Sequence, residues 1–328
     1  MHLINVHTRS LEEFHENPPE YAILSHTWGP EEEEITFREM KGGDLNKPGI
    51  GTTKLEGCLQ QAKTDKVDYV WIDTCCIDQS SSHELSFAIR SMFQWYQLAK
   101  KCYTYLQDVP SKANSRWKSK FRKSRWFTRG WTLQELLAPK ELNFYSHDWQ
   151  ALGTKQELSD VVWDITGIPA QFLRGDSGLE EASVAQRMSW ASNRKTKRVE
   201  DIAYSLLGIF GVSMVLMYGE GDHAFIRLQE SIIDKTPDDS ILAWGFKVRS
   251  SRNMLRHKVG GILAPSITAF AGCGKITWKN IGHATMDVKL LRGKFKLQLP
   301  LQSTKSKGTY GILRTQLNNP VVVDRRCV

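Results

Sequence analysis

Three polar stretches in the first 135 residues contain the side chains from which a binding or catalytic site could be built. Residues 25–28 follow an apolar run, residues 73–78 follow a second apolar run, and residues 125–135 combine arginines and tryptophans with a glutamate. They supply hydroxyl, imidazole, carboxylate and guanidinium groups close to indole rings. These stretches are the candidate site of the protein.

The third stretch carries the most chemistry per residue. If a helix starts near residue 131, Trp131 and Glu135 are four positions apart and share one face of it. A carboxylate beside an indole can be desolvated so that its pKa rises, or it can stabilise a developing cation in a water-poor pocket. The alternative is structural: Trp131 is buried and Glu135 forms an ion pair with Arg125 or Arg129.

The first two stretches lie at the ends of predicted strands. His26 either makes a structural hydrogen bond there or contacts a ligand. Ser25 and His26 are adjacent in a strand and diverge, which argues against a Ser/His/Asp triad, and the chain has no GxSxG motif. Asp78 is interpreted as part of a turn before a helix. Asp73 directly follows the strand, so we expect it to bind a sugar hydroxyl or to orient His26.

The elements that hold these stretches alternate along the chain. Strands are predicted over residues 3–6, 21–28, 69–72, 102–106 and 141–145, and helices over 11–14, 54–65, 85–99 and within 126–137. A strand–helix–strand order favours right-handed parallel crossovers, and hence an α/β fold with a mostly parallel sheet flanked by helices. In such sheets ligands bind beyond the carboxyl ends of the strands, where two of the polar stretches would lie.

The pattern changes after residue 150. Helical spacing is found over residues 155–165, 184–209 and 223–233, and short β-like runs such as 241–246 and 275–278 follow. We therefore predict three parts: an α/β domain over 1–150, a helical extension packed on it over 151–245, and a smaller β-rich C-terminal domain over 246–328.

The net charge of +8 raises the question of nucleic acid. Eight Lys or Arg and no acid lie within residues 112–129, interleaved with Trp117 and Phe121, which could stack bases. No recognised nucleic-acid motif accompanies them, so the interpretation we favour is a solvated basic surface.

The six cysteines form no CxxC pair, and the sequence predicts neither a disulfide nor a metal site. The longest apolar segment, residues 209–218, is too short to span a bilayer and is interrupted by glycine and serine. The N-terminus lacks the basic start and apolar core of a secretory signal. We expect a cytoplasmic protein without a membrane partner.

The chain resembles the fungal heterokaryon incompatibility (HET) domain family in three motifs that occur in the same order. They are Tyr21-Ala-Ile-Leu-Ser-His-Thr-Trp-Gly29, Tyr69-Val-Trp-Ile-Asp-Thr-Cys-Cys-Ile-Asp-Gln79 with Glu84 following, and Arg125-Trp-Phe-Thr-Arg-Gly-Trp-Thr-Leu-Gln-Glu135. The resemblance implies a role in non-self recognition, in which a HET domain triggers cell death when a separate sensor or incompatibility partner detects non-self. We also expect self-association for activity.

HET domains are also similar to TIR domains, which implies a flavodoxin-like, TIR-like sheet. Enzymatic TIR domains cleave NAD at the nicotinamide glycosidic bond with one glutamate, and Glu135 resembles that glutamate. NAD would then be a substrate and not a cofactor, and Glu135 would stabilise the ribosyl cation or hold the ribose hydroxyls. The residues implied to bind the substrate are Ser25, His26, Trp28, Asp73, Arg125, Arg129 and Trp131. Two alternatives stay open: a non-enzymatic death-signalling module and a toxin that acts on nucleic acid.

Overall fold

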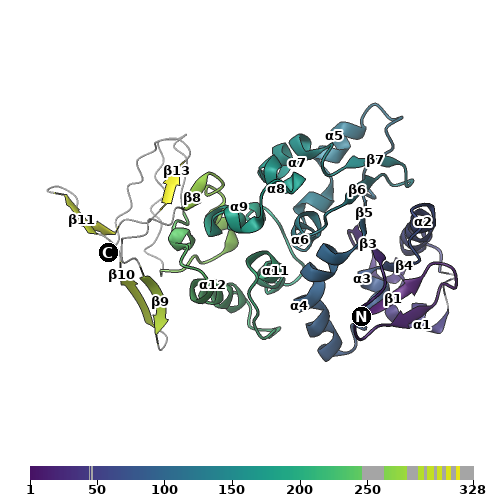
Figure 1. The fold of residues 1–328 in the computed structure, drawn as a ribbon, viewed down its shortest axis with the longest axis horizontal. Helices are drawn as coiled ribbons and strands as arrows, with labels where there is room; N and C mark the ends of the chain where they lie inside the picture. The colour runs from purple at the N-terminus through teal and green to yellow at the C-terminus, as the bar shows by residue number, and fades with distance from the viewer. Residues whose placement is uncertain are drawn as a thin grey trace. The chain divides into compact units, whose positions relative to one another are not determined.

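The computed structural model describes residues 1–43, 45, 47–245 and 262–278, together with the backbone of five strands between residues 287 and 317. The chain divides into two compact units, Met1–Asp176 and Ser177–Val328 (Figure 1). All three polar stretches belong to the first unit. This unit extends past residue 150, and the division into three parts stays a prediction.

The first unit is built on a seven-stranded sheet of order β2-β1-β4-β3-β5-β6-β7. Its strands are β1 (His2–Asn5), β2 (Leu11–Glu13), β3 (Tyr21–His26), β4 (Tyr69–Trp71), β5 (Lys101–Tyr105), β6 (Leu142–Tyr145) and β7 (Ala151–Thr154). The four central strands β4, β3, β5 and β6 are parallel, whereas β2, β1 and β7 pair antiparallel with their neighbours. The fold is therefore α/β, with a mixed, partly parallel sheet.

The prediction of a mostly parallel sheet was wrong at both edges. A parallel crossover needs a dozen or more residues, but only residues 6–10 join β1 to β2 and only residues 146–150 join β6 to β7. Both connections must therefore be hairpins. The segment predicted as a helix over 11–14 is the strand β2 for the same reason, and Arg9 in its turn adopts a positive φ of 60°.

Eight α-helices of the first unit are described. They are α1 (Phe37–Gly42), α2 (Ile50–Thr64), α3 (Asp73–Cys76), α4 (Ser82–Leu98), α5 (Trp117–Arg122), α6 (Thr132–Leu137), α7 (Ser159–Thr166) and α8 (Ala170–Arg174). Sequence spacing located α2, α4 and α6 correctly. The N-cap of α4 is Ser81, whose side chain accepts a hydrogen bond from the backbone N–H of Glu84.

Helices cover the two faces of the sheet. Trp71 of β4 contacts Trp95 of α4 with ring centroids 5.6 Å apart, whereas Tyr103 of β5 donates a hydrogen bond of 2.8 Å to Asp65 at the end of α2. α4 thus lies on one side of the strands and α2 on the other, as Figure 1 shows.

Neighbouring side chains of β3 point to opposite faces. Ser25 lies two residues beyond the position that pairs with Trp71, so it faces the side of α4. His26 lies two residues beyond the position that pairs with Tyr103, so it faces the side of α2. This alternation decides which candidate residues can meet.

The second unit begins with helices and continues as paired strands. Its helices are α9 (Val184–Ala191), α10 (Asp201–Tyr204), α11 (Leu207–Phe210) and α12 (His223–Lys235). Its antiparallel pairs are β8 (Ile276–Trp278) with β13 (Thr315–Leu317), β9 (Asp287–Leu291) with β10 (Lys294–Gln298), and β11 (Leu301–Thr304) with β12 (Gly308–Gly311).

Two predictions for this part have different outcomes. The run 241–246 was predicted as β, but Asp239–Leu242 is the 3-10 helix η4. The predicted domain boundary at residue 246 lies outside the described residues.

Among the helices of the described part of the chain, none combines the length and the hydropathy needed to cross a bilayer.

Candidate functional site

The order in which the chain adds parallel strands to the sheet reverses at β3. From β3 the chain crosses to β4 on one side and then returns to β5 on the other, so β3 and β5 flank the point where the strand order reverses. Crevices form outside the carboxyl ends of strands at such a point. β3 ends at His26 and β4 is followed directly by Asp73, which places both residues at this edge.

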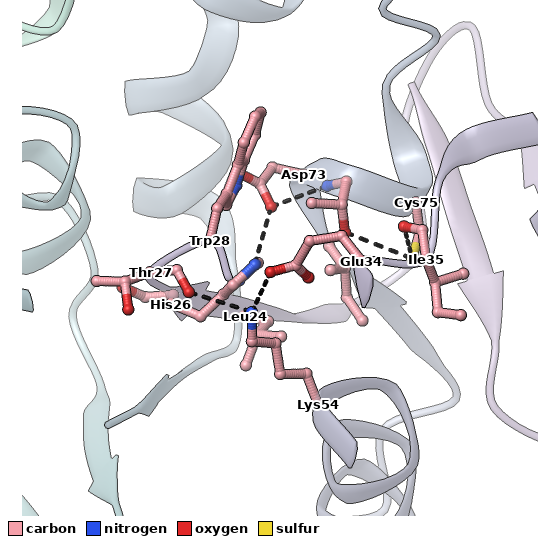
Figure 2. A network of polar contacts seen from close by, with 12 residues as sticks. Leu24, His26, Thr27, Trp28, Glu34, Ile35, Lys54, Asp73 and Cys75 are labelled. Carbon is pink, nitrogen blue, oxygen red and sulfur yellow. Dashed lines mark hydrogen bonds and ion pairs between the residues drawn. The ribbon is translucent and has the colours of Figure 1, made fainter. Parts of the chain in front are cut away.

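His26, Trp28 and Asp73 meet on the α2 side of the sheet (Figure 2). The Nε2 atom of His26 lies 3.7 Å from Oδ1 of Asp73, and the indole N–H of Trp28 donates a hydrogen bond of 2.7 Å to Oδ2 of the same carboxyl. Oδ1 of Asp73 also accepts a hydrogen bond of 2.8 Å from the backbone N–H of Thr74. Asp73 therefore fixes the orientation of Trp28 and faces the imidazole.

A buried ion pair below this cluster was not foreseen from the sequence. Lys54 of α2 pairs with Glu34, and the two side chains are only 2% and 6% exposed. Lys54 also donates a hydrogen bond of 3.1 Å to the carbonyl of Thr27, and Glu34 accepts one of 2.5 Å from the backbone N–H of Gly29. The pair thus holds the loop that carries Trp28, as Figure 2 shows.

Arg125 holds the same loop from another element. It belongs to the 3-10 helix η2 (Arg125–Thr128), and its guanidinium donates hydrogen bonds of 3.1 Å to the hydroxyl of Thr27 and of 2.8 Å to the carbonyl of Trp28. Arg125, one of the two arginines implied to bind the substrate, is therefore at the site, and its guanidinium is partly used in holding the loop.

Burial shapes the protonation of this cluster. It lowers the pKa of His26 well below its usual range, and the charge of Lys54 acts in the same direction, so the imidazole is neutral at neutral pH. Burial raises the pKa of Asp73 to about 6, against the opposing effect of the Trp28 hydrogen bond. The Nε2 atom of His26 is buried and makes no hydrogen bond within the described part of the chain.

Ser25 and Glu135 form a second cluster on the α4 side of the sheet. The indole N–H of Trp126 donates a hydrogen bond of 2.8 Å to the hydroxyl of Ser25, which in turn donates one of 2.5 Å to Oε2 of Glu135. Ser25 is fully buried and Glu135 is 5% exposed. The hydroxyl oxygen of Ser25 accepts the hydrogen bond from Trp126. The hydroxyl proton is therefore directed to the carboxylate of Glu135.

Arg129 and Trp131 lie between η2 and α6. Both are half-buried, and α6 begins at the next residue, Thr132, as the sequence predicted. The hydroxyl of Thr132 donates to the carbonyls of Trp126 and Arg129, at 2.6 and 2.9 Å, which ties the start of α6 to η2.

The structure therefore separates the predicted site into two clusters. His26, Trp28, Asp73 and Arg125 come together on one side of the carboxyl edge of β3, and Ser25 and Glu135 come together on the other. Glu34 and Lys54 were missed because the acidic run 31–34 looks like a surface feature. The signal that could have revealed Lys54 is its position in a helical stripe, four residues before the buried Cys58.

Residues 21–115 match the family model described as Heterokaryon incompatibility protein (HET). This chain contains a HET domain. The matched range of the HET domain includes Ser25, His26, Trp28 and Asp73, whereas Glu135 lies C-terminal to it.

A curated relative supports the same assignment. The chain is 46% identical over 257 residues to "Vegetative incompatibility protein HET-E-1" of Podospora anserina, an alignment that covers 76% of this chain and 18% of that protein. This chain thus spans less than a fifth of the length of that relative. Residues 223–318 match a domain of unknown function, DUF8212. No solved structure matches the chain.

Proposed function

We propose that this chain is an effector of fungal vegetative incompatibility, a form of non-self recognition that ends in cell death. The HET domain and the identity to the incompatibility protein of Podospora anserina support this role. In this proposal a separate sensor or incompatibility partner triggers the effector, and self-association activates it.

We further propose that the effector hydrolyses NAD at the bond between nicotinamide and ribose. The observation that carries this proposal is the contact of Glu135 with Ser25, at 2.5 Å, at the carboxyl end of β3. In order of appearance the parallel strands are arranged 2-1-3-4, as in the first four strands of a flavodoxin-like sheet, whose ligands bind where the order reverses. A TIR-like fold with its catalytic glutamate in α6 would have this arrangement.

The proposed reaction breaks the glycosidic bond through an oxocarbenium-like state. Nicotinamide leaves with the bonding electron pair, water adds to the ribosyl carbon, and a proton is released, so that ADP-ribose and free nicotinamide result. Glu135 would oppose the developing positive charge or hold the ribose hydroxyls, and Ser25 would keep the carboxylate in place. NAD is the substrate, and the step needs no cofactor.

The cluster of His26, Trp28, Asp73 and Arg125 would bind the substrate. The neutral His26 and the carboxyl of Asp73 would orient the sugar, and Arg125 or Arg129 would bind the diphosphate. The indole of Trp28 or of Trp131 would stack on nicotinamide.

Nicotinamide release tests this activity directly. Purified protein is incubated with NAD, and nicotinamide is measured by chromatography for the unmodified chain, for Glu135→Gln and for the exposed control Glu141→Gln. We expect Glu135→Gln to reduce turnover by about 100-fold or more, because one electrostatic stabiliser of a transition state typically has that effect. Glu141→Gln should retain full turnover. Equal turnover of Glu135→Gln and the unmodified chain would refute the assignment.

The burial of Glu135 favours a second candidate function. A carboxylate that is 5% exposed and bonded to a fully buried serine can be a structural group. The HET domain would then be a non-enzymatic signalling module whose surfaces recruit a partner. Cell death that persists in Glu135→Gln, without nicotinamide release, would support this function over the enzymatic one.

A further inference from the structure

The loop that joins α11 to α12 in the second unit exposes apolar side chains. Val215 is 69% exposed, Met217 46% and Tyr218 37%, and Val199, which precedes α10, is 56% exposed. In Figure 1 this loop projects beyond the two helices that it connects. Large apolar side chains gathered on a projecting loop usually mark a contact surface.

Buried polar contacts hold this loop in one conformation. The carboxylate of Glu200 accepts hydrogen bonds of 2.7 and 3.0 Å from the backbone N–H groups of Gly219 and Gly221. Both glycines have a positive φ, 101° and 59°, which other residues rarely adopt. The loop is therefore a rigid support for its exposed side chains.

A second set of contacts fixes the other side of the loop. The hydroxyl of Tyr204 donates a hydrogen bond of 2.8 Å to Glu220 and accepts one of 2.9 Å from the backbone N–H of Met217. Arg227 donates to Glu220 at 2.5 Å and to the carbonyl of Val215 at 2.6 Å. The carboxylate of Glu220 thus accepts its hydrogen bonds from side chains that hold the loop.

The charge that faces outward beside the apolar side chains is mainly positive. Lys195 and Arg198 are exposed, and the Arg198 guanidinium lies over the ring of Tyr218 at 4.4 Å. Asp222 is an exposed acid of the same loop, whereas Glu200 is buried. We define the apolar–basic patch by six residues: Lys195, Arg198, Val199, Val215, Met217 and Tyr218.

We propose, in place of the expectation from the sequence that there is no membrane partner, that the apolar–basic patch docks on the surface of a membrane that contains anionic lipids. A projecting loop places its apolar side chains among lipid headgroups without a matching groove, and the flanking bases attract anionic headgroups. The absence of a spanning segment in the described part of the chain is compatible with docking of this kind, because surface binding needs none. The proposal is independent of the NAD reaction.

Sedimentation with vesicles tests the docking. The full chain is mixed with vesicles of phosphatidylcholine alone or with phosphatidylserine added, and the bound fraction is measured at increasing salt. We expect binding to the anionic vesicles only, weakened by salt. Val215→Ser combined with Met217→Ser should weaken it about tenfold because apolar burial is lost. Lys195→Glu combined with Arg198→Glu should weaken it by at least about 25-fold, since each base contributes roughly fivefold and the introduced carboxylates repel the anionic headgroups.

Matched changes at other exposed positions separate this patch from general attraction. Leu98→Ser removes an apolar side chain that is 61% exposed, and Lys118→Glu combined with Lys120→Glu reverses two bases of α5. Circular dichroism is the check that each variant folds. Binding lost only in the patch variants supports the proposal. No binding to anionic vesicles, loss only in the α5 variant, or patch variants that change self-association but not vesicle binding would overturn it.

Discussion

Removal of one partner of the Lys54–Glu34 pair should destabilise the first unit strongly, whereas removal of both charges should not. Lys54→Met leaves the Glu34 carboxylate, 6% exposed, without its counter-charge. Breaking a buried ion pair in this way costs about 3 to 5 kcal/mol. The double variant Lys54→Met/Glu34→Gln removes both charges of the pair. The amide oxygen at position 34 can still accept a hydrogen bond from the backbone N–H of Gly29.

The expected cost of the double variant is small. It loses the hydrogen bond from Lys54 to the carbonyl of Thr27, which is worth roughly 1 to 2 kcal/mol. The double variant should therefore be about 1 to 4 kcal/mol more stable than Lys54→Met alone. Urea unfolding followed by circular dichroism, with the two units fitted separately, measures these differences.

An exposed pair on the same unit provides the control. Lys100 and Glu20 form an ion pair of 2.6 Å, but their side chains are 42% and 75% exposed. Because water screens such a pair, Lys100→Met should leave the free energy of unfolding unchanged within error. The reasoning fails if Lys54→Met is as harmless as Lys100→Met, or if the double variant of Lys54 and Glu34 is less stable than either single one.

Three further variants test the electrostatics of the clusters. The pKa of Asp73 is about 6 in the folded state and 3.8 in the ordinary case, so the folded chain holds this proton more tightly. The free energy of unfolding should therefore fall by up to about 3 kcal/mol as the pH rises from 3.8 to about 6. Denaturation of Asp73→Asn should lack this slope, and equal slopes would contradict the assignment. Burial lowers the pKa of Lys155 from 10.5 to about 8, so between these pH values the unfolded chain binds more protons and stability should rise with pH by up to about 3 kcal/mol. Unfolding curves of Lys155→Met should show no such rise; a rise that persists would point to another group. Ser25→Ala removes the hydroxyl between Trp126 and Glu135 and should cost about 2 kcal/mol in thermal or urea unfolding, an expectation that a neutral result would rule out.

Much of the first unit follows from local patterns. The apolar runs that end at His26 and before Asp73 are neighbouring parallel strands, and the stripe of Leu55, Cys58 and Leu59 is the buried face of α2. The resemblance to HET domains is confirmed over residues 21–115. These features depend on residues close together in the chain, and the spacing of the apolar residues indicates which face of each strand or helix is buried.

Features that depend on chain direction and on distant partners were harder to predict. β2 was taken for a helix, because three residues of an edge strand carry little periodicity and only the pairing with β1 stabilises them. Lys54 and Glu34 are twenty positions apart, and charged residues are normally exposed. The helical stripe of α2 could indicate that Lys54 is buried, but no local pattern indicated that Glu34 is its partner.

The sequence by itself determined the family, the α/β class and the presence of polar side chains at the carboxyl ends of β3 and β4. Only the tertiary structure decided which partners those side chains meet. Ser25 and His26 are neighbours in the chain, but the period of two in a strand sends them to opposite faces of the sheet. Ser25 meets Glu135 and His26 meets Asp73 because each face is covered by elements distant in sequence, which residue spacing cannot specify.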